Sequence, residues 1–409
     1  MKIVERFIKY VKVNTTSSSH SKSVPSTLIQ LELAEMLYEE LRDLGLEARL
    51  DQGYVYATLK SNIDSPTTTV GFIAHMDTAP DFNGENVNPR IIEKWDGSDI
   101  VLNNIRKISL KEFDNMKCMV GEDLIVTDGN SLLGADDKAG IAIIMDTIEH
   151  LVSNPNIKHG DIKICFTPDE EIGRGADHFD VEYFNADFAY TLDGGFANEF
   201  CYETFNAYDM DVSIKGISIH PGSAKDKLVN AISVANKFDN LLPKLMRPEY
   251  TEKKEGFNHL HGINGSAESC YMHYIIRNHD AKIIQEQIDE FTKIKDKLNK
   301  ELGYDAIEVK STLSYRNMYE ELHDKKEILD IAINAIRSVG LKEDIISARG
   351  GTDGSRLTFM GLLCPNLGTG STNAHGPFET CSINQMNKMK EIVLKVIDAV
   401  KDMKLWYIL

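Results

Sequence analysis

The chain contains the stretch Asp161-Ile-Lys-Ile-Cys-Phe-Thr-Pro-Asp-Glu-Glu171, an apolar, β-rich run that ends in carboxylates. Two other runs have the same form. They are Thr69-Val-Gly-Phe-Ile-Ala-His-Met-Asp77, which ends in a histidine and an aspartate, and Asp187-Phe-Ala-Tyr-Thr-Leu-Asp-Gly-Gly195. Short apolar runs of this kind are typical of buried strands. Because ligands of open α/β sheets gather at the carboxyl ends of the strands, we expect these side chains to meet at one edge of a sheet.

Two further pieces of sequence point to the same place. Leu132-Leu-Gly-Ala-Asp-Asp-Lys-Ala-Gly140 opens an amphipathic helix, and His375 follows the last apolar segment. Several carboxylates can share one point only if cations neutralise them. Imidazole and carboxylate ligands without thiolate suit Zn²⁺, Co²⁺ or Mn²⁺. A carboxylate held between two such ions places them about 3.5–4 Å apart, as in metal-dependent hydrolases. The sequence therefore predicts a two-metal hydrolase.

The adjacent pair Glu170 and Glu171 fits the chemistry of such a centre. Neighbouring residues that leave a strand point in different directions, so one can bind metal while the other faces the water. A general base must deprotonate that water and later pass the proton to the leaving amine. Each piece alone is weak, since Glu-Glu pairs are usually solvated and Asp-Gly-Gly is usually a turn. Their joint occurrence, in order, favours a site.

The bulk composition excludes several classes of partner. The chain has 409 residues, which is too long for one ordinary core, and a formal net charge of −18. Nucleic acids and anionic membranes need a basic surface, so we expect neither as a partner. The six cysteines form no Cys-x-x-Cys pair, which is typical of free thiols in a reducing compartment. No apolar run approaches the roughly 20 residues that span a bilayer. We therefore expect a cytoplasmic protein.

Strand and helix patterns alternate over most of the chain, which predicts an α/β fold with a mixed, largely parallel sheet and flanking helices. After Asn206 the order changes to strand, helix, two strands, helix and strand, the ferredoxin-like α+β order. We expect an inserted domain over residues 208–314. Residues 1–207 and 315–409 would then form one catalytic, metal-binding domain. The segment from Ala79 to Asp123 shows no regular pattern and is expected to be irregular.

Glycine-rich motifs allow one competing interpretation. Gly350-Gly351 and Gly354 could mark a phosphate loop, but no Gly-Lys-Ser/Thr follows them, so that interpretation fails.

Six motifs together resemble the M20 co-catalytic metallopeptidases. They are His75-Met-Asp77, Gly134-Ala-Asp-Asp-Lys-Ala-Gly140, Pro168-Asp-Glu-Glu171, Asp193-Gly-Gly195, His220-Pro-Gly222 and His375-Gly376. Longer stretches resemble the tripeptide aminopeptidases of that family more specifically: Asn86-Val-Asn-Pro89, His178-Phe-Asp-Val181, Met272-His-Tyr-Ile-Ile-Arg277 and Arg349-Gly-Gly-Thr-Asp-Gly354. The resemblance extends over essentially the whole chain. It implies a co-catalytic zinc-peptidase-like fold in which the inserted domain acts as a lid.

The resemblance also implies a set of metal ligands. Asp136 would bridge two ions. His75 and Asp193 would complete the ligands of one ion, and Glu171 and His375 those of the other. The family often has Cys where this chain has Met76, a position that we expect to point away from the metals.

Three residues receive catalytic roles from the resemblance. Asp77 would hydrogen-bond the far ring nitrogen of His75 and so fix its tautomer. Glu170 would act as the general base and then as the acid. His220, in the inserted domain, would stabilise the oxyanion of the tetrahedral intermediate when the lid closes. From the residues alone, His220 is instead a cap before the helix that follows it.

Substrate contacts are assigned more weakly. Arg277, at the end of a strand in the inserted domain, could clamp a substrate carboxylate in a bidentate pair, or could form a surface salt bridge instead. Asn230 and Arg349 are weaker candidates.

The resemblance therefore implies a metal-dependent aminopeptidase that removes the N-terminal residue of short peptides, above all tripeptides. It would use two divalent ions per subunit, with Zn²⁺ ahead of Co²⁺ and Mn²⁺. The nearest alternative is another M20 hydrolase: a dipeptidase, a carboxypeptidase or an N-acyl amino acid deacylase. A binding protein that has lost catalysis is disfavoured because Glu170 is present. Related families form lid-to-lid dimers, so a homodimer through the inserted domain stays open.

Overall fold

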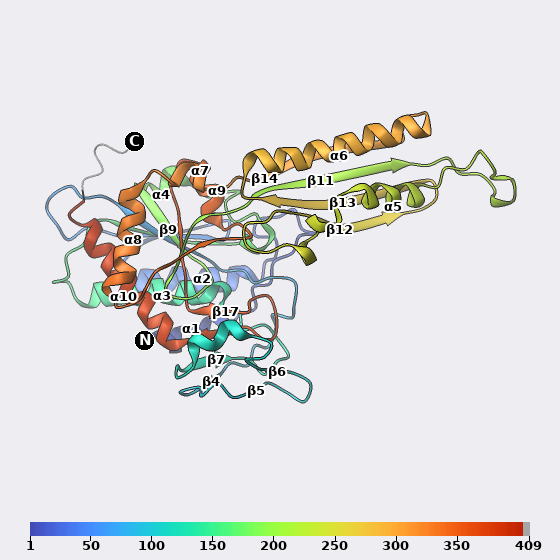
Figure 1. Cartoon of the computed structure of the whole chain (residues 1–409). Coiled ribbons are helices and arrows are strands. Elements are labelled where there is room, and N and C mark those ends of the chain that lie inside the picture. The colour runs from blue at the N-terminus through green and yellow to red at the C-terminus, as the bar shows by residue number, and fades with distance from the viewer. Residues whose placement is uncertain (404–409) are drawn as a thin grey trace. The chain divides into compact units, whose positions relative to one another are not determined.

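The computed structural model describes residues 1–403, which fold into two compact units (Figure 1). The main unit comprises Met1–Tyr202, Glu321–Ile346 and the chain from Thr352 onward, and the inserted unit comprises Glu203–Glu320 and Ser347–Gly351. The sequence placed residues 203–207, 315–320 and 347–351 in the catalytic domain, whereas the structure places them in the inserted unit. Residues 347–351 join that unit because Ala348 N donates to Glu203 O and Phe205 N donates to Gly350 O. Such long-range pairing leaves no local sequence signal.

The main unit is built on one mixed sheet. Its order is β1-β2-β8-β3-β9-β16-β10-β15. The strands are β1 (Glu47–Asp51), β2 (Tyr54–Leu59), β3 (Val70–His75), β8 (Ile162–Thr167), β9 (Phe188–Leu192), β10 (Glu199–Glu203), β15 (Asp344–Ser347) and β16 (Asn366–Leu367). Strands β8, β3, β9 and β16 run parallel at the centre, while the β1–β2, β2–β8 and β10–β16 pairs are antiparallel. The predicted fold class is confirmed.

Helices cover both faces of this sheet. One face packs against α1 (Ile3–Val11), α2 (Gln30–Asp43), α3 (Ala135–Ser153), α8 (Lys326–Ser338) and α10 (Ile383–Val400). The other packs against the segment with α4 (Val181–Phe184) and α9 (Asp353–Phe359), and α7 (Tyr319–Leu322) precedes α8. Phe72 enters the first core and its neighbour Ile73 the second. Burial on both faces explains why the central strands read as unbroken apolar runs.

The segment 79–123, expected to be irregular, contains short strands and a core of its own, so this prediction was wrong. A small sheet has the order β17-β18-β7-β4. Its strands, the neighbouring hairpin and one 3₁₀ helix are β4 (Arg90–Ile92), β5 (Ile100–Val101), β6 (Lys107–Ile108), η1 (Asp114–Met119), β7 (Leu124–Val126), β17 (Ser371–Thr372) and β18 (Thr380–Ser382). Trp95 and Met116 are buried in the core beside it. Strands of two or three residues are too short to show alternation, and half of this sheet comes from the distant segment 371–382.

The inserted unit has the ferredoxin-like order of elements. They are β11 (Asn206–Lys215), η3 (Pro221–Ser223), α5 (Ala231–Leu241), η4 (Lys244–Met246), η5 (Pro248–Tyr250), β12 (Phe257–Gly265), β13 (Ser269–Asn278), α6 (Ala281–Leu302) and β14 (Ile307–Tyr315). The antiparallel sheet has the order β12-β13-β11-β14. Helices α5 and α6 pack against one face of it, and α6 lies along the strands (Figure 1). Asp280 caps the start of α6, and Gly303, with φ of 79°, ends it.

Within residues 1–403, no helix combines the length and the apolar character that crossing a membrane requires.

Replacing Phe291 tests whether the inserted unit has an independent core. Phe291 is fully buried, and its ring lies edge-on to Tyr274 with centroids 5.0 Å apart. We expect Phe291→Ala to lower the free energy of unfolding of this unit by about 3–5 kcal/mol, because it leaves a cavity. Hydrogen–deuterium exchange of β13 amides under increasing urea measures this loss. Ile283→Ala, on the exposed side of the same helix, should stay within about 0.5 kcal/mol of the unchanged chain. Equal losses in the two variants would contradict the assignment of this core.

Candidate metal centre

Three adjacent parallel strands bring the predicted residues to one edge of the main sheet. His75 is the last residue of β3, and Asp193 directly follows β9. Glu170 and Glu171 begin the 3₁₀ turn η2 (Glu170–Ile172), which starts three residues after the last residue of β8. In the register of the sheet, His75 lies opposite Thr167, the last residue of β8. The expectation that the three strand ends meet is confirmed.

The carboxylate of Asp136 lies between two histidines. Its Oδ1 is 3.0 Å from Nε2 of His75, and its Oδ2 is 3.4 Å from Nε2 of His375. The two histidines come from segments 300 residues apart in the chain, and each faces a different oxygen of one carboxylate. This is the arrangement that a carboxylate bridging two metal ions requires.

One further carboxylate accompanies each histidine. Asp193 Oδ1 lies 3.7 Å from Nε2 of His75, and Glu171 Oε2 lies 2.9 Å from Nε2 of His375. The side chains of Asp193 and Glu171 are 14% and 4% exposed, so water screens their charges little. The centre therefore divides into two sets, each with one imidazole and one carboxylate, that share Asp136. Imidazole and carboxylate donors of this kind fit Zn²⁺, Co²⁺ or Mn²⁺.

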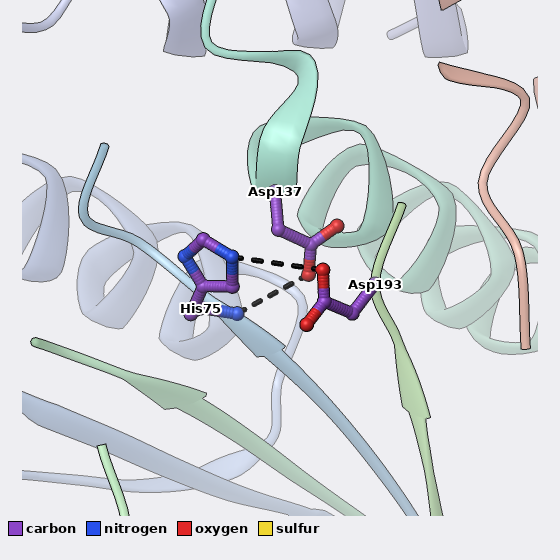
Figure 2. Close-up of side chains that lie close together, drawn as sticks. All are labelled: His75, Asp137 and Asp193. Atoms are coloured by element: carbon purple, nitrogen blue, oxygen red, sulfur yellow. Dashed lines mark hydrogen bonds and ion pairs between the residues drawn. The ribbon is translucent and has the colours of Figure 1, made fainter. Parts of the chain in front are cut away.

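Asp137 also lies in the centre and was not predicted (Figure 2). Ligand atoms of His75, Asp137 and Asp193 lie within 4.8 Å of one another, as do those of His75, Asp136 and Glu171. However, Asp137 Oδ2 accepts from the main-chain N–H of His75 at 3.3 Å, and Oδ1 accepts from Gly140 N at 3.2 Å. Because both oxygens already bind main-chain amides, we assign Asp137 to joining β3 and α3 rather than to the ligand set.

The charges of the centre shift the pKa of each group. Burial alone would lower the pKa of His75, but Asp136 and Asp193 raise it well above its usual range. Asp136 and Glu171 raise the pKa of His375 to about 11. Burial, and then the charge of Asp136, raise the pKa of Glu171 to about 8. The packed carboxylates thus pull protons onto both histidines. A divalent cation would displace those protons and satisfy the same negative charge.

The carboxylate of Asp77 is fully buried and holds the turn that carries the two glutamates. It accepts from Glu170 N at 2.9 Å and from Glu171 N at 3.2 Å. Nδ1 of His75 lies 3.4 Å from the Asp77 carboxylate but 3.1 Å from its main-chain carbonyl oxygen, which is the nearer acceptor. Asp77 therefore touches both strand ends. Met76 packs in the main core, as expected.

Comparison with known proteins identifies the family. The model of peptidase family M20/M25/M40 matches residues 129–399. The chain belongs to the M20 peptidase family. It is 50% identical to peptidase T of Clostridium botulinum (strain Hall) over 400 residues, which cover 97% of this chain and 98% of that protein. It is 48% identical to peptidase T of Clostridium novyi (strain NT) over the same shares of the two chains.

Solved structures agree with the fold of this M20 peptidase. A tripeptidase from Staphylococcus aureus superposes with a TM-score of 0.78 at 25% identity, covering 98% of both chains. Aminopeptidase PepT from Bacillus cereus superposes with a TM-score of 0.76 at 23% identity, covering 97% of this chain and 98% of that one.

Two predicted residues cap helices in the inserted unit of this M20 peptidase, one a 3₁₀ helix and the other an α-helix. His220 is exposed, and its Nδ1 accepts from Gly222 N at 3.1 Å, which caps η3. Asn230 Oδ1 accepts from Ile232 N at 2.9 Å at the start of α5. The capping interpretation of His220 therefore describes its contacts in this structure, and its role toward the oxyanion stays a prediction.

The two predicted arginines contact main-chain groups of the inserted unit. Arg277 Nη1 donates to Ile276 O at 2.9 Å, and its guanidinium lies over the ring of Tyr315. Arg349 Nη1 donates to the carbonyls of Lys253 and Glu255, at 2.7 and 2.8 Å. Arg349 thus ties the segment 347–351 to a neighbouring loop, a structural role that the sequence did not suggest.

Besides Asp137, the sequence missed two acids that contact the centre. Glu379 is 1% exposed and accepts three main-chain N–H groups of the loop that precedes and includes Asp136. Asp81 Oδ2 lies 3.7 Å from Nδ1 of His375. Glu379 follows His375 by four residues, and that proximity was the only sequence signal for it. Asp81 lies in the segment that was expected to be irregular.

Asp77→Asn tests the contact between the Asp77 carboxylate and the glutamate turn. Asparagine has one acceptor oxygen, so its NH₂ group would face an amide N–H of Glu170 or Glu171. We expect the affinity of the chain for Zn²⁺ to fall by about 10–100-fold, measured by isothermal titration calorimetry. Asp187→Asn is the matched control, since Asp187 accepts from Thr69 N at 2.7 Å near the opposite end of β3. Unchanged Zn²⁺ affinity in Asp77→Asn would contradict this role.

Proposed function

We propose that this M20 peptidase is a tripeptide aminopeptidase that works with two divalent metal ions. The observation that carries the proposal is the Asp136 carboxylate, whose two oxygens face His75 and His375 separately. We assign His75, Asp136 and Asp193 to one ion. The same Asp136, with Glu171 and His375, would hold the other ion.

The full-length relatives support the choice of substrate. The peptidase T proteins match the chain at 48–50% identity over 97% of its length, a share that includes nearly all of the inserted unit. The S. aureus structure, described as a tripeptidase, has the same fold over 98% of the chain. Because the match extends beyond the metal-binding motifs, it supports a shared substrate class as well as a shared metal site.

The chemistry divides between the ions and Glu170. When bound, the two ions act as a Lewis acid toward the peptide carbonyl and lower the pKa of water. Glu170 begins η2 beside Glu171, and Asp77 holds its main-chain amide. Burial, and then the charge of Asp193, raise the pKa of the Glu170 carboxyl well above its usual range. Glu170 is therefore suited to accept the proton of the attacking water and then donate it to the leaving amine.

Zn²⁺ is the metal that we propose first, with Co²⁺ and Mn²⁺ as functional substitutes. Two imidazoles and three carboxylates make up the donor set, and such ligands bind Zn²⁺ at about 2.0–2.2 Å.

We further propose that the chain has a catalytic domain and a substrate-contacting domain. The main unit carries the metal centre, and the inserted unit carries His220, Arg277, Asn230 and Arg349. Arg277 would bind the substrate's carboxylate, and His220 would stabilise the oxyanion. We place the protein in the cytoplasm, since the six cysteines are free thiols and five of them are buried.

Hydrolysis of an unblocked tripeptide tests the function. We expect release of the first amino acid, loss of this activity when a chelator removes the metal, and its recovery when Zn²⁺ or Co²⁺ is added. Chromatography of the products measures the release. The control substrates differ only in length and in blocked ends. If the tripeptide survives while an N-acyl amino acid is cleaved, the chain is a deacylase of the same family and the aminopeptidase proposal is wrong.

Replacing each glutamate tests the division of roles between them. Glu170→Gln should keep both metal ions but lower kcat by about 10²–10⁴-fold, because the amide cannot accept the proton. Glu171→Gln is the matched variant and should lose metal instead, since its carboxylate lies 2.9 Å from His375. Elemental analysis and steady-state kinetics on the two proteins separate the outcomes. Metal loss in Glu170→Gln would mean that the two roles are reversed.

A further inference from the structure

The carboxylate of Glu379 binds main-chain amides of the loop that leads to Asp136 and includes it. Its Oε2 accepts from Leu133 N and Gly134 N, each at 2.7 Å, and its Oε1 accepts from Asp136 N at 2.9 Å. The residue is 1% exposed. One carboxylate therefore satisfies three amides, including the amide of the residue whose side chain lies between the two histidines.

Asp136 is the second residue of α3, Gly134 is the cap of that helix, and Leu133 directly precedes the cap. The first N–H groups of a helix have no partner within the helix and attract a negative charge. A serine or asparagine at the cap position usually supplies an acceptor, but here that position is Gly134, with φ of 77°. Glu379 provides the acceptors from a segment 243–246 residues away in sequence.

Burying a second carboxylate beside Asp136 costs free energy of folding. Two carboxylates that lie close together repel each other, and burial strengthens the repulsion. The buried side chain of Lys138 lies against Gly134, the cap residue of α3. Its Nζ donates to Val13 O at 2.7 Å, which fixes the ammonium in place. A neutral cap would hold the helix without placing a second carboxylate beside Asp136.

The same short segment carries His375. Strands β17 and β18 pair in an antiparallel hairpin, and β18 also pairs with β7, which precedes the Asp136 loop. His375 lies in the turn of that hairpin and Glu379 directly precedes β18. The hairpin therefore presents one predicted ligand through His375 and fixes the backbone of the bridging residue through Glu379.

We propose that Glu379 is a positioning residue for the metal pair: by holding the amides of Leu133, Gly134 and Asp136, it fixes the Asp136 carboxylate so that each oxygen faces one ion. The inference rests on the two-metal site of the proposed function. It assigns to Glu379 a role in metal binding that a helix cap alone would not have.

Titration of the metal-free protein with Co²⁺ tests the proposal, because the visible spectrum of Co²⁺ reports each ion's ligands without any substrate. The unchanged chain should bind two ions. Glu379→Gln places an NH₂ group against at least one main-chain N–H. We expect it to keep one Co²⁺ and to weaken the other by about 10–100-fold, with an altered spectrum. If the Gln variant fails to fold, Glu379→Asp takes its place in the experiment. It keeps the charge but withdraws both oxygens by one methylene, and we expect the same loss of Co²⁺ affinity.

The matched control is Glu122→Gln. Glu122 accepts from Ser382 Oγ at 2.6 Å and from Gln385 Nε2 at 3.0 Å, so it anchors the opposite end of the same hairpin without contacting the centre. It should bind two Co²⁺ ions with the unchanged spectrum.

Two outcomes separate the inference from the alternatives. If folded Glu379→Gln melts at a lower temperature but binds both Co²⁺ ions with unchanged affinity and spectrum, Glu379 is a helix cap only and the proposal is overturned. If the unchanged chain cleaves no tripeptide but Glu379→Gln still loses one Co²⁺, the positioning role stands and the proposed substrate falls.

Discussion

The structure depends on one constraint: the carboxylate of Asp136 must present its two oxygens to two histidines at once. His75 ends a central strand and His375 lies in a surface hairpin, and the side chain of Asp136 lies between them at 3.0 and 3.4 Å. A carboxylate that must face two partners in different directions can use few side-chain conformations. The backbone on which it stands must therefore be set first.

Buried carboxylates that bind main-chain amides set that backbone. Asp77 holds the turn of Glu170 and Glu171, Asp137 joins His75 to α3, and Glu379 holds the loop before Asp136. Charge-assisted hydrogen bonds of this kind are worth about 1.5–3 kcal/mol each, more than neutral ones. These carboxylates concentrate negative charge in one buried region, and this charge contributes to the raised pKa values of His75, His375 and Glu171. A pair of divalent cations is the natural counter-charge for this arrangement.

The metal centre also requires that helix α3 pack closely against strand β9. A Cβ atom at Gly140 would lie 2.2 Å from Leu192 O, so only glycine lets α3 pack this tightly against β9. Because Asp136 starts that helix and Asp193 follows that strand, the distance between them depends on the same contact. The motif Gly134-Ala-Asp-Asp-Lys-Ala-Gly140 thus combines a predicted ligand, the residue that joins it to β3 and the glycine that brings it near β9.

The sequence by itself determined the fold class and the strand-end residues, because the apolar runs and the acids that follow them are local patterns. His75, Glu170, Glu171 and Asp193 follow directly from three parallel strands that share one edge. It could not show the small sheet that β4 and β7 form with residues 371–382, because strands of two or three residues are too short to show a period. Nor could it show that Glu379 binds the Asp136 loop, that Asp137 binds His75, or that Arg349 holds a loop of the inserted unit. Those contacts join residues that are 62 to 246 positions apart. Only the folded chain brings such acceptors and amides within hydrogen-bonding distance.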